Sequence, residues 1–316
     1  MRTFIKNIII FVIIAIFFNI YFSTIVKDNY FKKYSKDLHK KSSSTILLAC
    51  SHGNSLTEYI EGIDIYGITN YSYPSDSYTD MYRKLSHLIK RNKIDTLIIT
   101  AEDHTLSSYR QVLNNHDRSR DLSDKINFLS PTFFERNLIL PNSKAHDFLK
   151  LYIKSQISWF FSSNEILFHK KWSEYDKEYK QKKSQDRFVA QYVDKSYSME
   201  LENSLLKIIE ICKNNNIHLI GIKFPLSKEM VHVMKQSSLN FDKDSFYKNN
   251  RHIYDDTSLK VDSIFNANSI DIFNFKNLFI NKEHLFQNQD HLNALGAEKF
   301  NTILHEKFND LSNSNL

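Results

Sequence analysis

The sequence predicts an α/β protein in which a mainly parallel sheet lies between two layers of helices, preceded by one membrane-spanning helix. Residues 4–23 are almost wholly apolar. Short apolar runs then alternate with amphipathic segments in two series, at about 45–100 and 198–304, which is the pattern of strand–helix–strand units. A looser, charge-rich stretch at about 120–195 separates the two series, and we interpret it as a helical insertion.

The N-terminal segment FIKNIIIFVIIAIFFNIYFS has about the length that a bilayer needs, and Lys6 is its one charged residue. A cleaved signal peptide would have a shorter apolar core and a small-residue cleavage site, whereas Asn19, Tyr21 and Phe22 are poor surroundings for cleavage. We therefore predict an uncleaved anchor at 1–24. Because Lys and Ser are frequent after it, we predict a polar linker at 25–44.

The first series predicts three strands and the helices between them. The strands are expected at about 45–50, 63–68 and 94–100, with helices at 56–61 and 78–91. Asp76 or Ser77 is the expected cap of the second helix. Alternation of this kind favours parallel strands with helices on both faces of the sheet.

The insertion and the second series complete one predicted domain at 45–310. In the insertion, 145–161 has helical apolar spacing, and 170–187 is charge-dense, which is typical of a solvated loop or helix. The second series consists of a helix at 198–214, a strand at 217–224, a helix at 227–236, a strand at 270–273 and a terminal helix. Asn293 is the expected N-cap of that last helix, and Gly296 allows it to pack closely against a neighbour.

Two residues that are candidates for catalysis lie at the ends of these strand–helix units. Ser51 directly follows the first strand, at a carboxyl end, where α/β sheets place ligands. His291 lies in a polar loop just before the last helix, a place where a lone histidine more often caps or packs. Because a serine is a weak nucleophile until a base accepts its proton, the two residues together suggest a nucleophile–base pair.

The residues around this pair resemble the SGNH/GDSL hydrolase superfamily, and within it the membrane-anchored cell-envelope branch that is similar to polysaccharide O-acetyltransferases. ACSHG at 49–53 takes the place of the family's GDS-type serine block, and DHLNALGAEKF at 290–300 matches its terminal block, D-x-x-H-L-N-x-x-G. The resemblance covers about 44–110 and 262–308. It implies a flavodoxin-like, three-layer fold, with an acyl-enzyme on Ser51 and His291 as the base.

The sequence departs from that family pattern in three places. The serine block reads Ala49-Cys50-Ser51, the first Asp of D-x-x-H is Asn288, and after the third strand the first Asn is Asn114. By the family's spacing, Asn288 is expected to orient His291, while the adjacent Asp290 offers a full negative charge. Both stay candidates, and we rank Asp290 slightly ahead because charge matters more to an imidazolium.

Further residues are candidates for oxyanion or substrate binding. The oxyanion is expected to meet the backbone N–H of Ser51, with Asn70 or a nearby backbone donor as a second. The other candidates are His52, Asp103, His104, Tyr109 and Arg110. Asp103 and His104 directly follow the third strand and are candidates to bind substrate, orient a water or hold a metal; a solvated loop is an equally good interpretation. Because a metal site needs three or four converging ligands, we predict no metal and no cofactor.

Charge and cysteine content narrow the function classes. The 316 residues carry a net charge of +6 spread along the chain, which suits an anionic envelope surface. No recognised nucleic-acid motif accompanies the charge, so nucleic-acid binding is not predicted. Cys50 and Cys212 give no disulfide framework and are expected to be free, buried thiols.

Two function classes remain open. The first is a serine esterase or O-acyltransferase acting on acyl esters, chiefly acetyl esters, of a cell-envelope polysaccharide; transfer would need an acyl donor outside, for example from a multi-span membrane acyltransferase. The second is a catalytically inactive protein that binds glycan in the same cleft or scaffolds a biosynthetic complex. Arg2 and Lys6 favour a cytoplasmic N-terminus, whereas the lysines at 27–41 favour the opposite. We place the domain outside the cytoplasmic membrane because the resemblance implies work in the envelope.

Overall fold

The computed structural model describes residues 1–123, 130–137, 143–161, 171–193, 195–239 and 260–314. The chain forms two compact units. Unit 1 comprises Met1–His39 and Asp117–Phe168, and unit 2 comprises Lys40–His116 and His169–Leu316.

Unit 1 is helical where it is described. The helix α1, Arg2–Val26, continues through a π-helical stretch, Lys27–Lys32, into α2, Lys33–Ser35, and a 3₁₀ turn, Lys36–His39. The helices α7, Pro131–Asn137, and α8, Ser143–Phe161, complete the unit together with α6, His116–Ser119, and a 3₁₀ turn at Arg120–Leu122. The segment that reads as a polar linker in the sequence is thus helical as far as His39. Its Tyr30 and Phe31 are buried in a cluster with Ala145 and Leu149 of α8.

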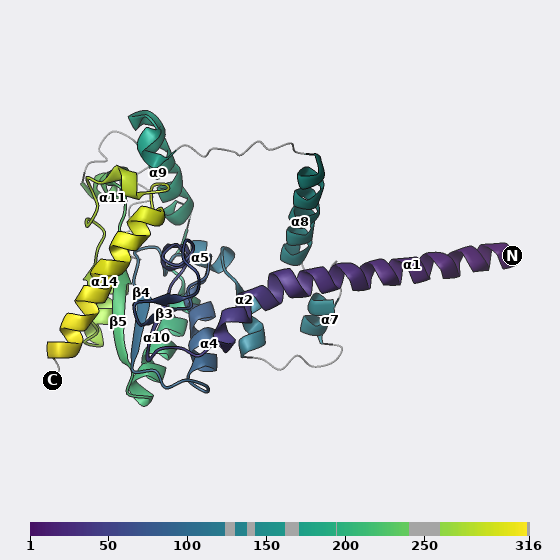
Figure 1. Ribbon diagram of the computed structural model, residues 1–316, viewed down its shortest axis with the longest axis horizontal. Helices are drawn as coiled ribbons and strands as arrows, with labels where there is room; N and C mark the ends of the chain where they lie inside the picture. Colours follow the sequence, from purple (N-terminus) through teal and green to yellow (C-terminus); the bar gives the residue numbers. More distant parts are fainter. Residues whose placement is uncertain (124–129, 138–142, 162–170, 194, 240–259, 315–316) are drawn as a thin grey trace. The chain divides into compact units, whose positions relative to one another are not determined.

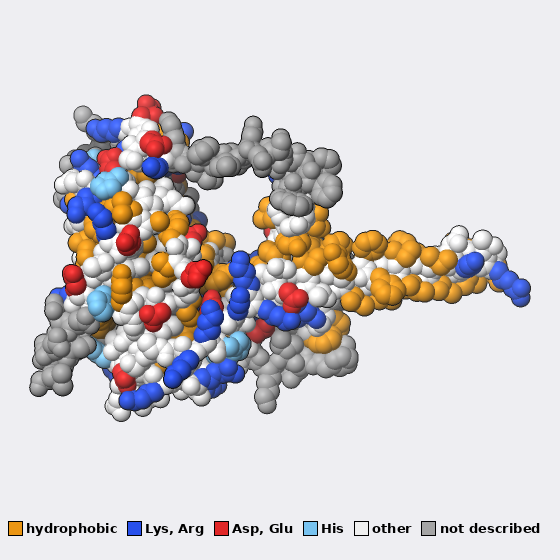
Figure 2. All heavy atoms as spheres, viewed as in Figure 1, with side chains coloured by type: hydrophobic (Ala, Val, Ile, Leu, Met, Phe, Trp, Pro, Cys, Tyr) orange, Lys and Arg blue, Asp and Glu red, His pale blue; other side chains and the backbone are white. Residues whose placement is uncertain are grey.

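The helix α1 is long and apolar enough to cross a membrane. Its hydrophobic side chains are exposed along most of its length, as Figure 2 shows. A core helix of the same composition would be covered by the rest of the chain, because that much exposed apolar surface is costly in water.

Unit 2 is built around a sheet that has six strands among the described residues, in the order β2-β3-β1-β4-β5-β6. The strands are β1 (Thr45–Leu48), β2 (Asp64–Ile65), β3 (Ile68–Asn70), β4 (Thr96–Thr100), β5 (His218–Lys223) and β6 (Ile272–Asn274). All neighbours pair in parallel except β2 and β3. Without β2, the chain order reads 2-1-3-4-5, which is the flavodoxin-like order with its topological switch point between β1 and β4.

Helices cover both faces of this sheet (Figure 1). The helices are α3 (Ser51–Asn54), α4 (Tyr78–Leu88), α5 (Tyr109–Val112), α9 (Lys177–Tyr192), α10 (Met199–Asn214), α11 (Lys228–Leu239) and α14 (Ala294–Ser314). There are also 3₁₀ turns at Trp172–Glu174 and Glu283–Leu285 and a further helical stretch at 260–267. Leu47 and Ile98 pack in one cluster with Phe300 of α14. Their neighbours Ile46 and Leu97 are equally buried and point to the opposite face, where α4 and α10 pack together. The predicted three-layer α/β/α sandwich is confirmed.

Two local predictions in the first series are wrong. The helix expected at 56–61 is a run of turns, and α3 begins at Ser51 instead. The single strand expected at 63–68 is a hairpin, because Tyr66 and Gly67 both have positive φ, 48° and 89°, and reverse the chain between β2 and β3. A two-residue turn with positive φ at both positions matches the twist of paired strands.

The predicted helix starts are confirmed. Ser77 caps α4 in a capping box with Asp80, and Ser198 caps α10. Asn293 accepts a hydrogen bond at 3.0 Å from the backbone N–H of Gly296 at the start of α14. Such caps satisfy amide groups that the first helical turn leaves unpaired. The expected free, buried state of Cys50 and Cys212 is also observed.

Gly296→Ala is expected to destabilise unit 2 by about 1–3 kcal/mol, the range for forcing extra atoms into a packed site. A Cβ at this position would overlap the Leu285 carbonyl oxygen, which is backbone and can move only with its chain. Urea unfolding of the full chain in detergent measures the change. Ala294→Gly in the same first turn is the control, and an unchanged midpoint for Gly296→Ala would contradict the close approach.

Candidate active site

The serine block forms a sharp strand-to-helix turn at the switch point of the sheet. Ser51 is the first residue of α3 and is partly exposed, and only Ala49 and Cys50 separate it from the end of β1. Gly53 is required two residues later, because a Cβ there would overlap the Ser72 hydroxyl and the Ala49 side chain. As the first helical residue, Ser51 has a backbone N–H that the helix does not use.

Asn70 holds this turn in place. Its amide nitrogen donates to the Gly53 carbonyl at 2.7 Å and to the Thr57 hydroxyl at 3.1 Å, and its oxygen accepts from the Ser72 N–H at 3.0 Å. Both amide protons are therefore used within the protein. Asn70, expected as an oxyanion donor, instead positions the turn that carries Ser51.

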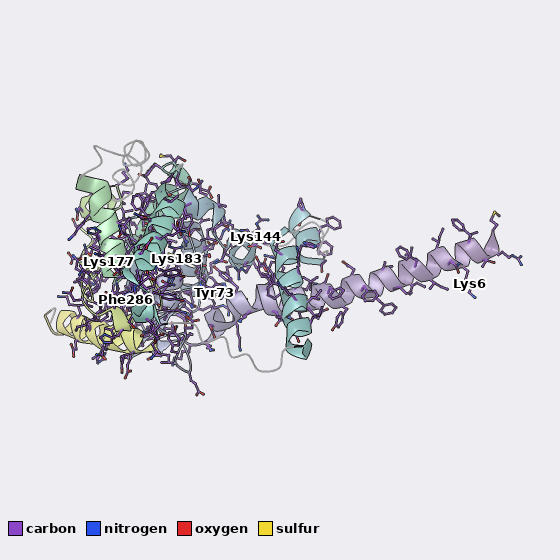
Figure 3. All side chains as sticks on the ribbon, turned by 90° about the horizontal axis from the view of Figure 1, so that it is seen from above. Lys6, Tyr73, Lys144, Lys177, Lys183 and Phe286 are labelled. Atoms are coloured by element: carbon purple, nitrogen blue, oxygen red, sulfur yellow. The ribbon has the colours of Figure 1, made fainter. Side chains whose placement is uncertain are left out.

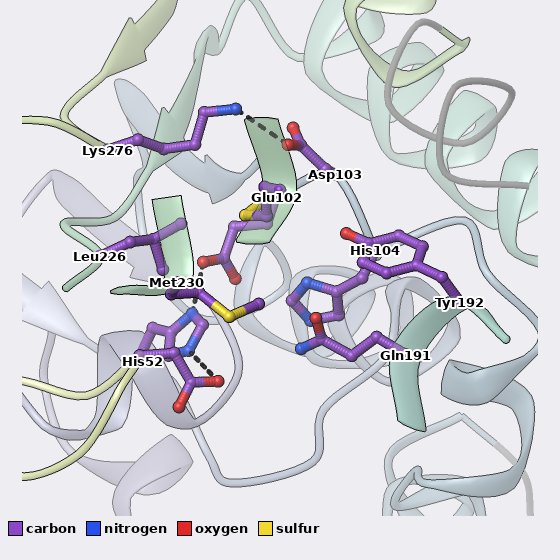
Figure 4. Close-up of a pocket in the computed structure, with 11 residues that line it drawn as sticks. His52, Glu102, Asp103, His104, Gln191, Tyr192, Leu226, Met230 and Lys276 are labelled. Atoms are coloured by element: carbon purple, nitrogen blue, oxygen red, sulfur yellow. Dashed lines mark hydrogen bonds and ion pairs between the residues drawn. The ribbon is translucent and has the colours of Figure 1, made fainter. Parts of the chain in front are cut away.

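A small buried pocket of about 20 Å³ lies beside this turn, with room for about one water molecule. Figure 4 shows residues that line it, with His52 and Glu102 facing each other and His104 and Gln191 on the opposite side. Its walls come from the carboxyl ends of β1 and β4 and from α9, α11 and the loop before α14. It contains three of the predicted site residues that follow strands, His52, Asp103 and His104.

His52 lies between two carboxylates. Its Nδ1 is hydrogen-bonded to Glu102, and its Nε2 lies 3.5 Å from an Asp290 oxygen. Burial lowers the pKa of His52, but Glu102, Cys50 and Asp290 together outweigh burial and hold that pKa well above its usual value. Burial likewise raises the pKa of Glu102, yet His52 lowers it to about 2. The two side chains therefore form a buried imidazolium–carboxylate pair at neutral pH.

His52→Gln is expected to lower the unfolding midpoint at pH 7 and to flatten its fall at alkaline pH. The pKa of His52 is raised on folding, so its stabilisation is complete below the ordinary value of 6.5 and is lost as pH rises through the raised pKa. Thermal unfolding of both proteins at stepped pH values above 6.5 measures the difference. The exposed His218→Gln is the control, and parallel curves for wild type and His52→Gln would contradict the charged pair.

The terminal block orients His291 through the Asn288 side chain, and the Asp290 carboxylate lies beside the same ring nitrogen. The Asn288 side-chain oxygen accepts from the backbone N–H groups of Asp290 and His291, at 3.1 and 2.9 Å, and lies 3.0 Å from His291 Nδ1. An Asp290 oxygen also lies 3.0 Å from Nδ1. The Asn288 acceptor and the negative charge of the nearby Asp290 favour the tautomer with its proton on Nδ1, which leaves Nε2 without a proton. The structure thus brings both candidate supports to His291.

Arg187 of α9 is a site residue that the sequence did not reveal. Its Nε donates to Asp290 at 2.6 Å, and its Nη1 donates to the Tyr109 hydroxyl at 3.1 Å. Burial raises the pKa of Asp290, but His291 and Arg187 outweigh it and hold the pKa well below its usual range. Arg187 lies in the run expected to be solvated, and no local pattern distinguishes it from the other cations there.

The remaining predicted residues divide between pocket and scaffold. Asp103 is buried between Lys223 and Lys276, with each ammonium 2.8 Å from a carboxylate oxygen. Burial lowers the pKa of His104 to about 3, so it is neutral in the pocket wall. Arg110 donates to the Asp76 carbonyl and lies outside the lining of the pocket.

No hydrogen bond between Ser51 and His291 exists among the described residues. The rings of His52 and His291 lie 4.7 Å apart, so the residue after Ser51 is in contact with the proposed base. Catalytic hydrogen bonds are often long or poorly aligned before substrate binds.

Two groups of three side chains also have metal-ligating atoms within 4.8 Å of one another. They are Cys50, Glu102 and His104, and His52, Asp290 and His291. Three ligands are the minimum for a catalytic metal. Glu102 and Asp290 already pair with His52 and Arg187, and the guanidinium beside Asp290 would repel a divalent ion.

Comparison with known proteins leaves the family of this chain open. No protein-family model and no curated protein matches it. Among solved structures it is similar to the crystal structure of a "putative acylhydrolase" from Bacteroides fragilis, with 8% sequence identity and a TM-score of 0.40 over 90% of this chain and 96% of that one.

Proposed function

We propose that unit 2 is a serine esterase or O-acyltransferase in which Ser51 is the nucleophile and His291 the base. The observation that carries the proposal is the placement of His291 Nδ1 against Asn288 and Asp290, 3.0 Å from each. A histidine oriented in this way, in contact with the residue that follows Ser51, supplies the oriented base of a serine–histidine pair.

The reaction follows from these positions. Ser51 Oγ attacks the ester carbonyl carbon while its proton passes to His291 Nε2. The backbone N–H of Ser51 stabilises the oxyanion. The bond to the alkoxy oxygen then breaks, the His291 proton goes to the leaving alcohol, and an acyl-Ser51 ester remains. Water or an acceptor hydroxyl repeats the steps in reverse, which gives hydrolysis or transfer.

The proposed substrate is an acyl ester, chiefly acetyl, of a cell-envelope polysaccharide. The support is α1, which is long and apolar enough to hold unit 2 at a membrane, together with the resemblance of the serine and terminal blocks. We place unit 2 on the outer side of the cytoplasmic membrane. Acyl transfer there takes its donor from a partner, such as a multi-span acyltransferase, because a single helix provides no path for an acyl group.

The experiment is labelling of the full chain in detergent with a fluorophosphonate, followed by mass spectrometry of the modified peptide. The expected result is one adduct on Ser51, lost on prior denaturation because activation needs the folded site. A folded chain without an adduct would overturn the esterase and favour the second function, a glycan-binding or scaffolding protein without catalysis.

Chelators are expected to leave ester hydrolysis unchanged. The Arg187 charge beside Asp290 opposes a divalent ion at the His52–Asp290–His291 group. Turnover of p-nitrophenyl acetate is measured after dialysis against EDTA and again after zinc is restored. A loss that zinc reverses would favour a metal-dependent hydrolase, in which the two groups of three ligands hold the ion.

A further inference from the structure

A groove of about 440 Å³ adjoins the terminal block, within the ~300–1,000 Å³ of ligand pockets. We call it the aromatic groove and define it by Lys171, Trp172, Tyr175, Tyr179, Lys183 and Asn288. Figure 3 labels two of its lining residues, Lys183 on α9 and Phe286 in the loop before α14. It is separate from the small pocket around His52, since the two share no lining residue.

One wall of the aromatic groove is a continuous run of rings. Tyr175 and Tyr179 are stacked with their centroids 4.3 Å apart, and Trp172 meets Tyr175 edge-on at 6.3 Å. Tyr179 is 37% exposed, so this run is not closed core. Tyr175 and the Lys183 ammonium lie over the Tyr179 ring, so it is the exposed edges of this run that offer contact to an apolar surface such as the C–H face of a pyranose.

The charge in the aromatic groove is positive. Lys171 and Lys183 are exposed, and the Lys183 ammonium lies 5.5 Å over the Tyr179 ring. Among the described residues that line it, none carries a carboxylate. A ligand that matches both the aromatic wall and the positive charge has rings with an apolar face and carries negative charge.

Asn288 connects the aromatic groove to the proposed base. Its side-chain oxygen lies 3.0 Å from His291 Nδ1, and its amide nitrogen has no partner among the described residues. That nitrogen can donate to a hydroxyl or carboxylate of a ligand. A ligand bound there lies one side chain away from His291.

We propose that the aromatic groove binds an acidic glycan segment, with sugar rings on Tyr175 and Tyr179, carboxylates at Lys171 and Lys183, and the acylated sugar next to His291. This inference rests on the proposed function for the ester chemistry, and the binding itself does not depend on it. Single-stranded nucleic acid also combines stacking with cations. We favour a glycan because the opposite wall, 287–289, consists of amide side chains, which pair with the many hydroxyls of sugars.

The test is calorimetric titration of the full chain in detergent with oligogalacturonate, the neutral galacto-oligosaccharide of equal length, and a single-stranded oligonucleotide. The expected order of affinity places oligogalacturonate first. Tyr179→Ala/Lys183→Gln is expected to weaken that binding at least about tenfold, because it removes a stacking face and a cation. Tyr82→Ala/Lys207→Gln is the matched control, since the ammonium of Lys207 on α10 lies 5.6 Å over the ring of Tyr82 on α4, outside the groove.

Each outcome decides between the two proposals. Equal affinity of wild type and Tyr179→Ala/Lys183→Gln, or tighter binding of the oligonucleotide or the neutral sugar, would overturn the acidic-glycan groove. A chain that is labelled at Ser51 but binds no oligogalacturonate loses only the groove. A chain that binds oligogalacturonate through Tyr179 and Lys183 without labelling keeps the groove and loses the esterase.

Discussion

Ser51→Ala is expected to lower the rate of ester hydrolysis at least about 10³-fold, and His291→Ala by about 10²–10⁴-fold. Without the Ser51 hydroxyl no acyl-enzyme forms, and without the His291 imidazole no group accepts its proton. Because the two residues act as one unit, the double variant is expected to be no slower than the slower single variant.

Initial rates with p-nitrophenyl acetate, together with fluorophosphonate labelling, measure these effects on the full chain in detergent. Ser196→Ala, an exposed serine in unit 2, controls for substitution as such and is expected to keep the wild-type rate. Additive losses in the double variant would contradict a shared mechanism. Full activity of Ser51→Ala would remove Ser51 from the chemistry altogether.

Asp103→Ala is expected to lower the free energy of unfolding by about 3 kcal/mol, the low end of the cost of leaving a buried charge without its partner. Lys223 is fully buried and loses one of its two carboxylates, while Asp262 remains 2.7 Å from its ammonium. Lys276 loses the same partner but is partly exposed, so water compensates it in part. A substrate-binding loop residue, the role expected from the sequence, would show little change in stability.

Urea unfolding monitored by far-UV circular dichroism measures this change. Asp95→Ala is the control, because Asp95 pairs with Lys93 at 3.2 Å on the exposed surface and is expected to cost less than about 1 kcal/mol. A loss for Asp103→Ala no larger than for Asp95→Ala would show that Lys223 is not held by Asp103.

Features that depend on a few consecutive residues could be predicted from the sequence. The cap at Ser77 and the cap at Asn293 are set by a side chain that reaches an amide three residues away. The strands come from apolar runs that are buried on both faces of a parallel sheet. The position of Ser51 after β1 could be predicted for the same reason, because it depends only on neighbouring residues in the sequence. The same holds for Asn288 and Asp290, which lie within three positions of His291.

Other features depended on tertiary structure. The Tyr66–Gly67 turn splits one apolar run into two strands, and its type I′ geometry carries no Asn-Gly signal. Arg187 looks like any cation of a solvated helix, yet it lies against Asp290, 103 positions later in the chain.

The sequence by itself determined the layers of the fold, the ends of its main helices and the two blocks that carry Ser51 and His291. Tertiary structure alone decided which charges meet, namely Glu102 with His52, Arg187 with Asp290, and Lys223 with Asp103. The physical reason is the distance along the chain over which each interaction acts. Caps and periodicity act over one helical turn or one strand, whereas an ion pair depends on where two distant backbones come together, and burial then sets the charge state of both partners.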